Sequence, residues 1–136
     1  MHSPRSSKGY RRGSSTTSRL DGAIYATTNA ALMDSQLGDD EKAMTELANV
    51  ARRAPNSADA RAALASLRWA AGRRAEAEEA WNSACGRAEG CAKYKDIDYV
   101  QRIRRWPPRM VKHLQAFLQL RDEAADDAAA AALAAR

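Results

Sequence analysis

The sequence repeats its own pattern with an offset of 34 residues. Residues 37–43 align with residues 71–77, which places Gly38 on Gly72. Self-similarity at a period of this length is typical of folds built by stacking copies of one small structural unit. Further pairs at the same offset are Ala43 with Ala77, Leu47 with Trp81 and Val50 with Ala84.

Each half of the repeat carries the marks of two helices joined by a tight turn. Glycine favours the left-handed backbone conformation that ends a helix, so Gly38 and Gly72 mark chain reversals. After each glycine, apolar residues recur at the i, i+4, i+7 spacing of one helix face. Pro55 ends one helix and Ser57 is a suitable N-cap for the next. The pattern predicts helices over residues 22–37, 40–53, 58–71 and 74–88.

The third unit departs from the repeat. The position 34 residues after Gly72 is Trp106, and two prolines follow it, so the glycine turn is not repeated. Residues 96–106 are expected to form a helix that Asp96 caps and Pro107 ends. Pro108 suits the first turn of a second helix that runs to Arg121. Because a stack of two units needs a terminal cap, residues 96–121 are predicted to close it.

The two ends of the chain differ from the domain between them. Residues 1–19 contain Ser, Thr, Gly and Arg with almost nothing to bury, so we expect a disordered basic arm. Its composition fits the remnant of an organelle transit peptide, and equally a solvated arm. Residues 20–121 form the predicted helical domain. The alanine-rich acidic tail, residues 122–136, is expected either to extend a helix into solvent or to fray.

Composition argues against several functional classes. No window approaches the roughly 20 apolar residues that a membrane-spanning helix needs, and we expect a soluble protein. No pairing of a nucleophile with a base and no metal-ligand cluster is apparent, and His113 is expected on the polar side of its helix as an ordinary surface residue. The chain is therefore predicted not to be an enzyme and to need no cofactor and no small-molecule substrate.

The two cysteines are too few for a disulfide scaffold. Cys85 and Cys91 are separated by a turn that contains Gly86 and Gly90, so their sulfur atoms could meet as a redox-sensitive pair. A reducing compartment is the simpler expectation, and there disulfides are uncommon. Free thiols are therefore favoured over a bridge.

Two surfaces are candidates for binding a partner. The first helix of each hairpin would line a concave face, where helical arrays hold peptides. The candidate residues on this face are Tyr25, Asn29, Leu32, Gln36, Ser66 and Trp69.

The second candidate surface is the C-terminal cap. Residues 93–121 carry eight basic and two acidic side chains, a net charge of +6, whereas residues 21–92 have eight basic and eleven acidic ones. Such a patch can bind an acidic protein, an anionic membrane surface or nucleic acid, and a protein is favoured over nucleic acid. The candidate residues of this basic cap are Arg102, Arg104, Arg105, Trp106, Arg109 and Lys112.

Residues 24–91 resemble the tetratricopeptide repeat superfamily, with repeats at 24–57 and 58–91. This resemblance implies an all-α solenoid of two helical hairpins, followed here by a divergent C-terminal helical pair. It also implies a protein-binding role. The matching positions lack the lysine and asparagine side chains with which co-chaperone members hold a terminal carboxylate, so that activity does not carry over.

The C-terminal part looks like chloroplast and cyanobacterial repeat proteins that are associated with thylakoids and photosystem biogenesis. The residues that carry this likeness are Trp81, Cys85, Cys91, residues 94–99 and residues 104–108, although Tyr99 stands where a tryptophan is expected. The resemblance implies an adaptor or assembly factor in the stroma or on the stromal face of thylakoids, with a cytoplasmic protein as the other possibility. An RNA-binding helical-repeat protein of an organelle is the alternative function.

Overall fold

A computed structural model describes residues 22–87 and 89–135, and every described element is helical. The arm predicted over residues 1–19 lies outside the described residues. A helix over residues 22–36 is followed by α2 (Asp40–Arg53), α3 (Ala58–Ala70) and α4 (Arg74–Arg87). The 3-10 helix η1 (Glu89–Lys95), the π-helical turn η2 (Tyr99–Ile103) and α5 (Pro108–Ala134) complete the chain. The predicted all-α fold class is confirmed.

The four helices of the two hairpins agree with the sequence pattern to within about a residue at each end. Both ends of α4 lie 34 residues after those of α2. Gly38 and Gly72 adopt φ values of +96° and +81°, as the predicted chain reversals require. The side chain of Asp39 accepts a hydrogen bond from the backbone N–H of Lys42, and the hydroxyl oxygen of Ser57 accepts one from Ala60. Local sequence therefore sets where each helix begins and ends.

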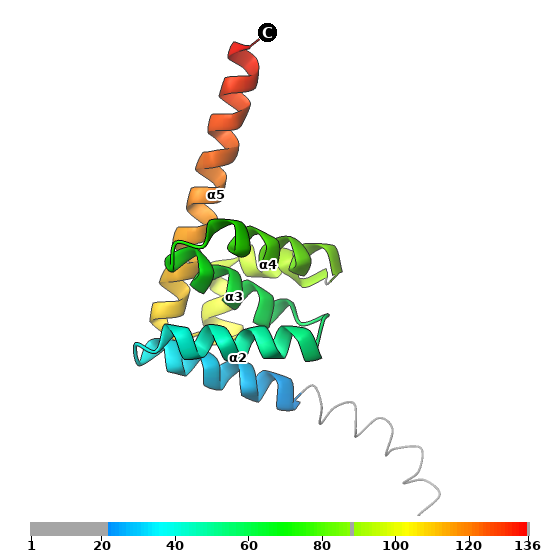
Figure 1. Ribbon diagram of the computed structural model, residues 1–136, viewed down its shortest axis with the longest axis vertical. Helices are drawn as coiled ribbons and strands as arrows, with labels where there is room; N and C mark the ends of the chain where they lie inside the picture. Colours follow the sequence, from blue (N-terminus) through cyan, green and yellow to red (C-terminus); the bar gives the residue numbers. More distant parts are fainter. Residues whose placement is uncertain (1–21, 88, 136) are drawn as a thin grey trace, which may run out of the picture.

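The core is built on alanine with a few large side chains between the helices. Ala43 and Ala77, the repeated small residues, are fully buried. Trp81 and Phe117 are the two largest fully buried side chains, and their rings meet edge to face at 5.5 Å between centroids. α3 lies at the centre and packs against α2, α4 and α5. In Figure 1 the hairpin helices form a stack that α5 crosses and then passes beyond.

The predicted helix over residues 96–106 is confirmed in part, because residues 97–103 are helical. Asp96 caps them, since its side chain accepts hydrogen bonds from the backbone N–H groups of Asp98 and Tyr99. The helical segment ends three residues earlier than predicted.

The short turn η2 ends at Ile103, whose side chain is 65% exposed, and Arg105 adopts a φ of +55°. This left-handed residue lies between Arg104 and Trp106, whose side chains both reach Asp59 of α3. The contacts of Arg104 and Trp106 with α3 begin where the helical segment ends.

The second helix of the cap begins at Pro108 as predicted, and it is longer than residues 108–121. α5 extends to Ala134, so the alanine-rich tail is a continuous helical projection and does not fray at Arg121. Residues 122–134 are all exposed. At 1.5 Å per residue, this projection is about 20 Å long.

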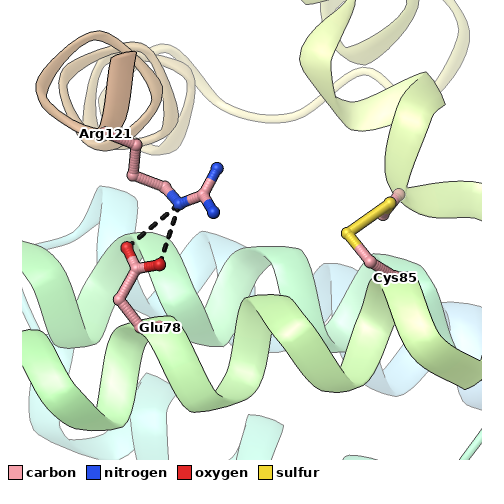
Figure 2. Close-up of a disulfide and its surroundings, with 4 residues drawn as sticks. Glu78, Cys85 and Arg121 are labelled. Atoms are coloured by element: carbon pink, nitrogen blue, oxygen red, sulfur yellow. Dashed lines mark hydrogen bonds and ion pairs between the residues drawn. A yellow bond between two sulfur atoms is a disulfide. The ribbon is translucent and has the colours of Figure 1, made fainter. Parts of the chain in front are cut away.

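The prediction of free thiols is also wrong, because Cys85 and Cys91 form a disulfide. Their Cα atoms are 4.9 Å apart, a separation that suits a disulfide. The bond ties the C-terminal end of α4 to η1, as Figure 2 shows. The bridge holds in place the segment that carries Tyr94.

The turn glycines offer a direct test of the hairpin geometry. A Cβ at position 72 would meet no atom within 4 Å, so the cost of Gly72→Ala comes from the positive φ alone. We expect a loss of about 1 kcal/mol in the free energy of unfolding, measured by urea titration. Gly86→Ala is the matched control, since Gly86 is helical with equally open space, and it should stabilise the protein by up to about 1 kcal/mol. Equal effects at the two positions would contradict the assigned turn conformation.

Candidate functional site

The concave side of the helical stack is covered by the protein's own C-terminal segment. The side-chain oxygen of Gln36 accepts a hydrogen bond from the backbone N–H of Arg109 at 2.9 Å. The guanidinium of Arg109 pairs with Asp40 at 2.7 Å. Further along α5, Phe117 is buried against the ring of Trp69. α5 therefore covers the side of the stack that the first helix of each hairpin forms.

A buried carboxylate anchors this segment. Asp59 lies in the first turn of α3, is 2% exposed and receives hydrogen bonds from three side chains of the C-terminal segment. The Tyr94 hydroxyl donates at 2.9 Å and the Trp106 indole N–H at 3.1 Å. Arg104 donates through Nε and through Nη2, each at 2.8 Å and each to a different oxygen. Asp59, Tyr94, Arg104 and Trp106 are called the Asp59 cluster below.

The surroundings of Tyr94 and Arg104 in the Asp59 cluster keep both side chains protonated. Burial, reinforced by the nearby Asp59 carboxylate, raises the pKa of Tyr94, so its phenol remains a hydrogen-bond donor. The hydrogen bond to Asp59 raises the pKa of Arg104, which keeps its charge. All four donor contacts point at the carboxylate, so the cluster anchors the C-terminal segment on α3.

The residues predicted for the concave face fall into two groups. Leu32 and Ser66 are buried, and the Ser66 hydroxyl donates to the carbonyl of Ala62, so the expectation that these two contact a partner is wrong. The other residues lie at the surface but contact the C-terminal segment. The Arg104 guanidinium stacks on Tyr25 at 4.3 Å and reaches Asn29 at 3.4 Å, Gln36 binds Arg109, and Trp69 packs on Phe117.

The basic cap is less basic at its surface than its composition indicates. Trp106 is buried, so its prediction as a partner-binding residue is wrong. Arg104 pairs with Asp59, and Arg102 pairs with Asp98 at 2.8 Å. Arg109 is held by Asp40. Of the six predicted residues, Arg105 and Lys112 are the ones left exposed without an ion pair.

A groove lies where α5 leaves the second hairpin. The guanidinium of Arg74 stacks on the ring of Trp69 at 4.8 Å from its centroid. Arg121 donates from Nε to both carboxylate oxygens of Glu78, each at 3.0 Å. Figure 2 shows this second contact. The groove has a volume of about 340 Å³, and we call it the ledge. Its lining residues are Trp69, Arg74, Glu78, Leu120, Arg121, Asp122, Ala124 and Ala125.

Sequence reasoning missed the role of Asp59 altogether. One signal was available: Asp59 is the only acidic residue in a helix that otherwise carries small, apolar and basic side chains. Its partners are 35 to 47 residues away along the chain, so no local pattern could have identified them.

Comparisons with protein-family models, with curated proteins and with solved structures found no match to this chain. Over residues 22–87 and 89–135, no three His, Cys, Asp or Glu side chains gather in a way that could hold a metal ion. Within the same described ranges, no helix has the length and apolar character needed to cross a bilayer.

Removal of the buried carboxylate should be costly. Asp59→Ala leaves the Arg104 guanidinium without its partner in a site where it is 14% exposed, so we expect a loss of about 3 kcal/mol in the free energy of unfolding. Arg102→Ala is the control, because its ion pair with Asp98 is exposed and should contribute no more than about 0.5 kcal/mol. Urea titration measures both. Similar losses for the two variants would contradict the anchoring role of Asp59.

His113 makes the stability depend on pH. Contrary to the expectation of a surface residue, its Nε2 atom is buried without a hydrogen-bond partner. Burial lowers the pKa of His113 below 6.5, Arg109 lowers it further, and Asp40 acts in the opposite direction. Because the unfolded chain then binds more protons, stability should fall as the pH drops below about 6.5.

The test compares melting temperatures at pH 7.5 and 5.0 in the wild type and in His113→Leu. The decrease should be smaller in the variant. Asp40 does not titrate in this window: burial acts to raise its pKa, but hydrogen bonds from Arg109 and Ser35 outweigh it and hold the pKa below the ordinary 3.8. An equal decrease in both proteins would show that His113 is not the group responsible.

Proposed function

We propose that this chain is a non-enzymatic, protein-binding helical module that acts as an adaptor or assembly factor. The single observation that carries the proposal is the projection of α5, whose residues 122–134 are all exposed beyond the stack. A long helix that leaves its own domain offers a surface to another molecule. The proposed membership of the tetratricopeptide repeat superfamily supports the same role through the 34-residue period and the two glycine turns.

The ledge is the part of this surface that we propose as the binding site. It combines a half-buried aromatic side chain, Trp69, with Leu120, which is 40% exposed. Partly exposed aromatic anchors of this kind often dominate binding at protein interfaces. Trp69 is the residue predicted for the concave face that also lines the ledge. The proposed binding site therefore lies at the edge of that face, because α5 covers the face itself.

The charge of the projection indicates what kind of partner segment fits. Four acidic residues lie on two consecutive turns of α5 and share one side of the helix: Asp122, Glu123, Asp126 and Asp127. A partner segment with an apolar face flanked by lysine or arginine would complement both the ledge and this acidic side. We propose a subunit of a thylakoid or photosystem complex as the partner, on the basis of the resemblance of residues 81–108 to thylakoid-associated repeat proteins.

The test is affinity capture with the full chain from nuclease-treated extract of the cells that express it, followed by mass spectrometry. Leu120→Glu places a charge on the ledge and should reduce recovery of the captured partner at least tenfold. Leu133→Glu is the matched control, since Leu133 is on the same helix, is 66% exposed and lies away from the ledge, and it should leave recovery unchanged.

Equal recovery with both variants would contradict the ledge as the binding site. Loss of the partner on nuclease treatment alone would instead favour RNA as the ligand. The internal pairing of Arg102, Arg104 and Arg109 is the structural observation against that outcome.

A further inference from the structure

The helix over residues 22–36 and the turn that follows it carry an exposed apolar stripe at the end of the stack. The stripe consists of Ala23, Ala26, Ala30, Met33 and Leu37, which recur at helical spacing and are all exposed. Met33 is 49% and Leu37 is 79% exposed. In Figure 1 this helix is the blue element at the opposite end of the stack from the α5 projection, so the stripe is separate from the ledge.

The second hairpin shows what normally covers such a face. The repeat offset places Ala26, Ala30 and Met33 on three residues of α3. These residues, Ala60, Leu64 and Leu67, are 0%, 3% and 1% exposed. α3 packs against α2 of the first hairpin, where Ala48 and Ala51 lie beside Leu64. In the part of the chain that the structure describes, the corresponding face of the first helix is exposed.

We propose that this stripe is a self-association surface that pairs with the same stripe of a second copy of the chain, which goes beyond the proposed adaptor function. In the pairing, two copies of the helix run antiparallel about a two-fold axis at Ala30. Each Ala30 then faces its counterpart, and Leu37 of one copy lies opposite Ala23 of the other.

The order of residue sizes along the stripe argues for a second copy as the occupant. Its large side chains are at one end and its small ones at the other, so the antiparallel arrangement sets large against small. At the small end is a groove of about 170 Å³ lined by Ala23, Ile24, Thr27, Val50 and Arg53. The antiparallel arrangement brings the protruding Leu37 of the second copy to this groove.

The charged residues beside the stripe are also compatible with the pairing of two copies. Asp34, at the edge of the stripe, already pairs with Lys42 at 3.8 Å. At the rim, the two-fold arrangement brings Arg53 of one copy toward the turn that carries Asp39 of the other, so opposite charges approach. No like charges face each other along the five stripe residues.

The size of the contact between the two helices determines how tightly two copies of the chain are expected to bind. A helix of 15 residues is about 22 Å long. A contact between two such helices is at the small end of specific interfaces, so we expect a reversible dimer with a dissociation constant in the micromolar range or weaker.

The test is sedimentation velocity of the full chain over a concentration range that crosses the micromolar region. The wild type should shift from monomer to dimer. Ala30→Glu and Ala30→Lys should each remain monomeric, because each places like charges across the two-fold axis. A mixture of the two variants should recover the dimer, since only a pairing of position 30 with itself makes the two charges complementary.

Ala116→Glu is the matched control, because Ala116 is an exposed helical alanine of α5 outside the stripe, and it should dimerise as the wild type does. A wild type that stays monomeric throughout the range would overturn the proposal. Dimerisation that survives in both Ala30 variants would also overturn it. Dimerisation that appears only after deletion of residues 1–19 would assign the stripe to that arm and not to a second copy.

Discussion

The carboxylate of Asp59 is the interaction on which the arrangement of the C-terminal third depends. A charged group that is 2% exposed is stable only when it is paired and hydrogen-bonded, and here Arg104, Tyr94 and Trp106 meet that requirement together. Tyr94 lies in η1, and Arg104 and Trp106 lie between η2 and α5. Their hydrogen bonds to the Asp59 carboxylate therefore fix the path of the chain from η1 to the start of α5. The left-handed backbone conformation of Arg105 and the disulfide between Cys85 and Cys91 also constrain the backbone along this path.

This anchoring determines which surfaces remain free for function. α5 covers the face that the first helix of each hairpin forms, so the residues predicted to bind a partner there are buried or contact the C-terminal segment. The accessible surfaces are therefore at the edges: the ledge beside the projecting half of α5, and the apolar stripe on the first helix. Both are proposed as binding surfaces, and they lie at opposite ends of the stack, so one protein could use both at the same time.

The sequence predicts the hairpins well because their determinants are local. Gly38, Gly72 and Ser57 act within a few residues of the helix ends that they set, and the alanine pair at 43 and 77 shares the repeat offset. The C-terminal segment was predicted less well because its conformation depends on contacts with α3 that span 35 residues or more. The count of charged residues overestimated the basic surface of the cap for the same reason. It gave eight basic side chains, but it could not show which of them are paired with acidic residues. Four are paired: Arg102, Arg104, Arg109 and Arg121.

The most direct measurement is hydrogen exchange at the indole N–H of Trp106, followed by nuclear magnetic resonance on the full chain. This group is buried and donates to Asp59, so it can exchange only when the C-terminal segment opens from α3. The structure predicts an exchange rate slower by orders of magnitude than that of an exposed indole. Exchange at the rate of an exposed indole would contradict the account, because the segment would then not be anchored on the concave face.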